Sequence, residues 1–97
     1  MFTELKQTVR FMNSEDYKKR FIAEYWQLKI RYEKLVRMCY DWDHNKLKFI
    51  PSCPRSWYDE QLKAMKLYLD VLEKRAAREG INLDDTRRVQ NAKSKTN

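Results

Sequence analysis

The stretch FIAEYWQLKIRYEKLVRMCYDW, residues 21–42, places apolar residues at alternating steps of four and three. This is the pattern of a helix that packs lengthwise against another helix. The polar run NSED at residues 13–16 combines a small capping residue with two acids, which predicts that the helix begins there. Ile30 and Met38 widen the apolar face, so we expect more than one neighbour to cover it.

A second stretch, PRSWYDEQLKAMKLYLDVLEKRAARE at residues 54–79, repeats the same alternation. Pro54 suits the first helical position. Gly80 followed by Ile81 predicts a left-handed C-cap, so this helix is expected to end at about Glu79. Turn formers and prolines predict a loop over residues 43–52. Its apolar residues, Leu47, Phe49 and Ile50, are expected to pack over the end of the helix pair.

The fold class predicted from these patterns is all-α: an antiparallel two-helix hairpin with a short N-terminal helix, assembling into an oligomeric helical bundle. Off-seam side chains such as Trp26, Ile30 and Trp57 exceed what one hairpin covers, and chains of 97 residues seldom build an adequate core alone. We expect a short helix or arm at 1–13, although residues 8–11 also suit a strand. The hairpin domain is 14–81, and 82–97 is predicted to be a disordered polar tail.

Composition and residue types exclude several function classes. One Gly and two Pro argue against turn-rich β folds and Gly-rich phosphate loops. No apolar run approaches the ~18 residues of a membrane span, so no membrane partner is expected. No secretory signal is recognised, so an intracellular protein is the default. No catalytic set accompanies the lone His44, and we predict no enzyme, metal or cofactor. Cys39 and Cys53 are expected to be free thiols, with a disulfide as the alternative.

Cations and tyrosines are the candidate binding groups. The formal net charge is +7, and the basic residues are spread along the chain, as on the solvated flanks of a coiled coil. In the expected hairpin, however, Arg20, Lys34 and Arg75 lie near Tyr17 and Tyr68. A tyrosine can stack on a nucleobase while a cation holds its phosphate.

Residues 13–35, 49–54 and 61–81 resemble the helical hairpin shared by the phage anti-CBASS and anti-Thoeris sponge proteins, a likeness that covers about residues 13–83. The resemblance implies a protein of the host bacterial cytoplasm that binds cyclic di- or trinucleotide messengers of bacterial immunity and sequesters them uncleaved. It also implies a hexamer of interlocked hairpins with ligand pockets between protomers. The anti-Thoeris members also carry a β-rich part, for which this chain has no room. The chain therefore resembles the anti-CBASS type more closely.

Site residues carried over from the resemblance are Tyr17 and Arg31 for a cyclic dinucleotide, with Lys34 as the fallback, and Arg75 for a separate trinucleotide site. Tyr17 can equally be a packing residue at a helix start, and Arg75 a favourable charge at a helix C-terminus. Two other functions stay open. One is a non-enzymatic phage accessory protein whose hairpin binds a protein partner. The other, which we do not favour, is weak binding of a nucleic-acid polymer through the basic tail.

Overall fold

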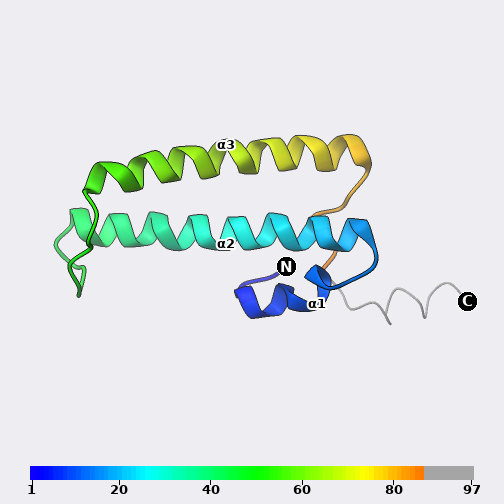
Figure 1. The fold of residues 1–97 in the computed structure, drawn as a ribbon, viewed down its shortest axis with the longest axis horizontal. Helices are drawn as coiled ribbons and strands as arrows, with labels where there is room; N and C mark the ends of the chain where they lie inside the picture. The colour runs from blue at the N-terminus through cyan, green and yellow to red at the C-terminus, as the bar shows by residue number, and fades with distance from the viewer. Residues whose placement is uncertain (87–97) are drawn as a thin grey trace, which may run out of the picture.

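The computed structural model describes residues 1–86, and two long helices dominate it. Helix α2 spans Tyr17–Asp43 and helix α3 spans Arg55–Glu79. They run antiparallel, side by side, joined by the loop at residues 44–54 (Figure 1). A 3-10 helix, η1 at Leu5–Thr8, continues into the short α1 at Val9–Met12. Residues 1–86 contain no strand, which confirms the all-helical class and the helical alternative for residues 8–11.

The start of each long helix lies later than the sequence patterns predict. Helix α2 begins at Tyr17, because Asp16 is extended, at ψ 117°, and its side chain accepts a hydrogen bond from the Lys18 amide at 2.9 Å. The acids at 15 and 16 therefore precede the first turn. Pro54 is the N-cap of α3 and not its first helical residue, since its ψ of 145° is extended.

The end of α3 is as predicted. Gly80 adopts the left-handed conformation at φ 71°. The Ile81 amide donates to the Ala76 carbonyl oxygen at 2.9 Å, and the Ile81 side chain is buried. This is the six-to-one bond and hydrophobic contact of a Schellman cap.

The core lies between α2, α3 and the N-terminal segment, toward the end of the hairpin where α2 begins and α3 ends (Figure 1). From α3, Leu69, Leu72 and Ala76 are buried. Trp26 and Ile30, which were predicted to need a second chain, are only 5% exposed within the protomer. For these two residues the expectation is wrong, because η1 and α1 pack on the side of α2 that α3 leaves open, with Phe2 and Phe11 in edge-to-face contact. Trp57, named with them, remains 59% exposed.

The C-terminal segment after Gly80 also covers α2. The Trp26 indole donates to the Leu83 carbonyl oxygen at 2.6 Å, and Leu83 packs on the core. Packing contacts therefore continue into residues 82–86, the first part of the predicted tail. The remainder of that predicted tail, residues 87–97, lies outside the described residues.

At the other end of the hairpin the packing is looser. The seam residues Leu35, Leu62 and Met65 are only half-buried. In the loop, Phe49 is 57% and Ile50 94% exposed. The prediction that these two residues pack over the end of the helix pair is wrong. The loop turns back through Asn45, whose φ is 59°, and leads both side chains into solvent.

Candidate functional site

The candidate site is a group of four side chains where the start of α2 meets the end of α3; we call Tyr17, Phe21, Arg75 and Glu79 the Tyr17–Arg75 cluster. The Arg75 Nη2 donates to the Tyr17 hydroxyl oxygen at 2.9 Å, and that hydroxyl donates to Glu79 Oε1 at 2.9 Å. The guanidinium carbon of Arg75 lies 4.9 Å from the centre of the Phe21 ring. Tyr17 is the first residue of α2. Because α3 runs antiparallel to α2, Arg75 and Glu79 in its last turns lie beside Tyr17.

Arg75 is held in place yet open to a ligand. Its Nε contacts Glu79 Oε2 at 3.4 Å, a long bond, and its side chain is 47% exposed. Desolvation acts to lower the pKa of Arg75, but attraction to Tyr17 and Glu79 outweighs it and raises the pKa above its ordinary value. Of the five N–H donors of a guanidinium, only the one on Nε and one of the two on Nη2 have partners among residues 1–86. The donors on Nη1 are available for an anion.

Two further tyrosines bridge the helices deeper along the seam. The Tyr68 hydroxyl donates to Glu24 Oε2, and the Tyr25 hydroxyl donates to Glu73 Oε2 at 2.8 Å. The bond to Glu24 raises the pKa of Tyr68, and burial followed by the bond to Glu73 raises that of Tyr25. Tyr25 is buried, whereas Tyr68 keeps 45% of its surface exposed. Tyr68 therefore offers an accessible ring on the same helix as Arg75.

The structure brings some of the predicted site residues together and leaves others apart. Tyr17 and Arg75 are in contact, and Tyr68 lies two turns before Arg75 on α3. Arg20 donates instead to the Ser14 carbonyl oxygen at 2.9 Å, on the turn before α2. Arg31 and Lys34 are exposed on α2 and make no hydrogen bond or ion pair within residues 1–86. They lie about 20 Å or more along the axis from Tyr17, so one protomer does not unite them with the cluster.

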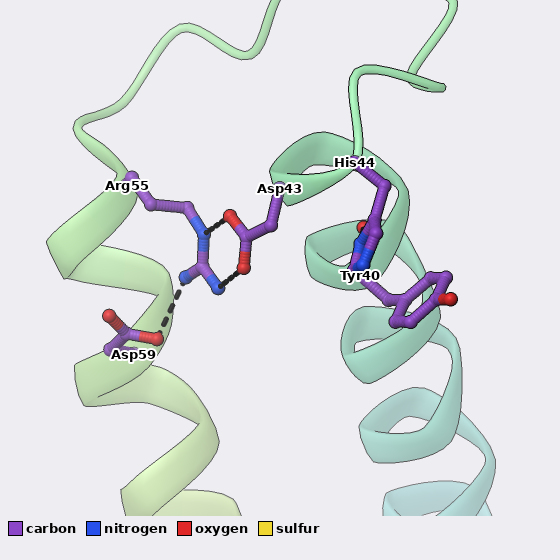
Figure 2. Close-up of polar contacts among 5 residues, drawn as sticks. All are labelled: Tyr40, Asp43, His44, Arg55 and Asp59. Carbon is purple, nitrogen blue, oxygen red and sulfur yellow. Dashed lines mark hydrogen bonds and ion pairs between the residues drawn. The ribbon is translucent and has the colours of Figure 1, made fainter.

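Sequence reasoning missed an ion-pair cluster at the loop end of the hairpin. Arg55 binds Asp43 through two hydrogen bonds of 3.1 Å and reaches Asp59 at 2.8 Å (Figure 2). The guanidinium also lies 5.7 Å from the Trp42 ring. The spacing of Arg55 and Asp59, one helical turn apart, was the available signal. Asp43 comes from the other helix, and only the fold reveals it.

Other aromatic residues gather near this ion-pair cluster. His44 stacks on Tyr40 with ring centres 4.0 Å apart, and the Tyr40 ring points away from α3 (Figure 2). A shallow groove of about 270 Å³ lies under the loop, lined by Trp42, Asn45, Leu47, Phe49, Ile50 and Pro51. Its walls are mainly apolar and carry no ionisable side chain. The groove therefore lacks the cations that the Tyr17–Arg75 cluster offers.

Residues 1–86 hold no group of three His, Cys, Asp or Glu side chains placed to bind a metal ion. Cys39 is buried and Cys53 half-buried, and both are free thiols. Within the same residues, neither long helix has an apolar stretch sufficient to cross a bilayer.

Comparison with protein families gives a match over the hairpin. A family model described as Sequestin matches residues 15–78. The chain belongs to the Sequestin family. The matched range includes Tyr17, Phe21 and Arg75, and it stops one residue before Glu79. The N-terminal segment that packs on Trp26 and Ile30 lies outside it.

The name Sequestin indicates sequestration of a ligand, which confirms the resemblance to a sequestering, or sponge, family. The name does not specify which ligand is sequestered. No curated protein and no solved structure matches the chain significantly.

Proposed function

We propose that this Sequestin chain binds cyclic oligonucleotide messengers of bacterial immunity and sequesters them without cleavage, as a phage anti-defence protein in the host cytoplasm. Cyclic dinucleotides are the primary ligands, and cyclic trinucleotides or cyclic ADP-ribose-like signals are further candidates because they also combine phosphates with a flat base. The observation that carries the proposal is the Arg75 guanidinium, fixed by Tyr17 with free N–H donors, inside the hairpin that the family model matches.

The cluster offers the two kinds of contact that such a ligand needs. A cyclic nucleotide presents phosphates and flat bases, which cations and aromatic rings bind respectively. Arg75 supplies the cation, and the half-exposed rings of Tyr17 and Tyr68 supply flat surfaces. The Arg75–Glu79 pair is solvent-exposed, and exposed pairs of this kind add little stability, so a phosphate can replace Glu79 at low cost.

The cluster is suited to holding the ligand and not to hydrolysing it. Its one hydroxyl group, on Tyr17, donates to Glu79, and the hydroxyl of the nearby Tyr68 donates to Glu24. A carboxylate is far too weak a base to ionise a tyrosine, because the ordinary pKa values differ by about 6 units. We therefore infer that binding, in stoichiometric amount, is the whole activity.

Arg31 and Lys34 contact the ligand only in an assembly of several chains. Both are exposed cations, and neither reaches the cluster of its own protomer. In a homo-oligomer, which the resemblance makes a hexamer, a neighbouring chain presents them to a ligand that contacts Tyr17 or Arg75. Ligand binding is then expected to depend on assembly.

Isothermal titration of the purified chain with a panel of cyclic dinucleotides, a cyclic trinucleotide and cyclic ADP-ribose tests the proposal. We expect saturable binding of at least one of them, and linear dinucleotides of the same bases are the matched control. Heat denaturation of the complex should release the ligand with an unchanged chromatographic retention time. Absence of binding across the panel contradicts the proposed ligand class, and recovery of a linearised nucleotide contradicts sequestration.

A further inference from the structure

Helix α3 carries a second row of apolar side chains on the side away from α2. Trp57, Leu67 and Val71 are 59%, 60% and 48% exposed, and Ala64 lies between them. At about 100° per residue, this row is centred about 150° around the helix from the row that packs on α2. η1 and α1 contact α2 but not α3, so no described element covers it. An exposed apolar row of this length indicates a contact surface.

The row has the spacing of a coiled-coil seam. It occupies alternate three- and four-residue steps at positions 57, 60, 64, 67, 71 and 74. Its apolar centre is flanked by an acid, Glu60, toward the start of α3 and by a base, Lys74, toward the end. Parallel pairing with another copy of α3 brings like charges together at both positions. Antiparallel pairing brings Glu60 of each copy near Lys74 of the other, which is favourable.

The charges beside the row select one antiparallel register. Lys63 and Asp70 occupy equivalent flanking positions, seven residues apart. When Ala64 packs on Leu67 of the second copy, Lys63 lies beside Asp70 of the second copy, twice by symmetry. A shift by one heptad places Asp70 beside Asp70 of the second copy, which is repulsive. Lys63 has no partner within residues 1–86, and Asp70 has only the exposed Lys66 at 2.6 Å.

We propose that α3 is a self-association surface, on which a second copy of this chain docks its own α3 antiparallel about a two-fold axis between residues 65 and 66. The occupant is a second copy because the charges on and beside the row are complementary to themselves in the antiparallel register. Tyr68 and Arg75 lie on the edge of this surface that faces α2, and Gln61 of the second copy lies opposite Tyr68. The pairing thus brings another chain to the edge of the Tyr17–Arg75 cluster. The pairing itself does not depend on a bound ligand.

A charge-swap series tests the register, with molar mass measured by light scattering over a wide range of protein concentration. The chain mass is 12.0 kDa. We expect the wild type to form an even-numbered oligomer, and Lys63→Asp and Asp70→Lys each to lower the mass at a given concentration. The double variant should restore it, because the swapped charges again pair between copies. Each single change also perturbs neighbours on its own helix, but the double variant retains those perturbations, so restoration isolates the contact between copies.

Arg37→Asp, an exposed charge reversal on α2, is the matched control and should leave the mass unchanged. Circular dichroism of each variant establishes that the hairpin is folded. A wild-type mass of one chain at all concentrations overturns the proposal, as does a double variant that stays at the mass of the single variants. Nucleotide titration of the same samples keeps the questions separate, since a wild type that binds a nucleotide as a single chain overturns the self-association surface and leaves the proposed ligand class standing.

Discussion

The Arg55 guanidinium at the first residue of α3 holds the carboxylate of Asp43, the last residue of α2, through two nearly parallel hydrogen bonds of 3.1 Å. This two-bond geometry fixes both the distance and the angle between the guanidinium plane and the carboxylate plane. It joins the helices at the loop end, where Leu35 and Leu62 are half-buried and Cys39 is buried. The ion pair therefore acts together with the packing of Cys39, and of Trp42 on Tyr58, to hold the two helix ends beside the loop.

The stability of the hairpin should depend on pH through this pair. The hydrogen bond from Arg55, and its charge, lower the pKa of Asp43. A lowered pKa contributes stability that is complete above the unfolded value of about 3.9 and is lost as the pH falls through the folded value. Asp43→Asn should therefore lose less thermal stability than the wild type between neutral and strongly acidic pH. Glu15→Gln, an exposed acid before α2, is the control, and equal losses in Asp43→Asn and wild type contradict the prediction.

The packed end of the hairpin should depend on Leu72, whose side chain is fully buried. Leu72→Ala leaves a cavity between α2 and α3 and is expected to lower the free energy of unfolding by about 2 to 5 kcal/mol. Ile50→Ala, at a 94% exposed position in the loop, should change it by less than about 0.5 kcal/mol. Urea denaturation followed by circular dichroism measures both. Similar losses at the two positions would mean that the seam carries little of the stability.

Those parts of the fold that depend on local periodicity were predictable from the sequence. The seam of α3 and the left-handed Gly80 follow from residues within a few positions of each other. The N-caps of both long helices were predicted one to three residues early, because several residues at each start can cap and only the backbone conformation selects one. Burial of Trp26 was not predictable, since it depends on packing by two segments distant in sequence.

The same distinction applies to the candidate site. Tyr17 and Arg75 were both named from the sequence, and they meet because the antiparallel register brings positions 58 residues apart together. Glu79 was not named, although it completes the cluster. The Arg55 cluster was missed for a related reason. An arginine at the start of a helix has several acids within reach on two helices, and the sequence does not rank them.

The contact between Trp26 and Leu83 should secure the segment after Gly80. Trp26→Phe keeps most of the buried ring but removes the indole N–H that donates to the Leu83 carbonyl oxygen. We expect a loss of about 1 to 2 kcal/mol in the free energy of unfolding. Amide hydrogen exchange should rise at residues 81–86 more than in the middle of α3. Tyr40→Phe, which removes a polar group from an exposed aromatic residue of α2, is the control, and equal exchange in both variants would contradict this role for Trp26.

Arg31 tests whether the ligand pocket is shared between chains. Its position is about 21 Å along α2 from Tyr17, so it reaches a cluster-bound ligand only from another protomer. Arg31→Ala is expected to weaken cyclic dinucleotide binding by about 1 to 3 kcal/mol, as for a lost charged hydrogen bond, while the oligomer persists. Titration calorimetry together with light scattering measures both properties. Unchanged affinity in the intact oligomer would remove Arg31 from the pocket.

Tyr17 has two separable roles in the proposed binding, because its ring is half-exposed while its hydroxyl bridges Arg75 and Glu79. Tyr17→Phe keeps the ring and frees Arg75 to move, so we expect a modest loss of cyclic nucleotide affinity with a stronger dependence on salt. Tyr17→Ala also removes the stacking surface and should cost about 1 to 3 kcal/mol. Lys18→Ala, the exposed neighbour whose side chain makes no bond within residues 1–86, should bind as the wild type does. If calorimetry gives the two Tyr17 variants equal affinities, the ring does not stack on a base; if both match the wild type, the ligand does not occupy this cluster.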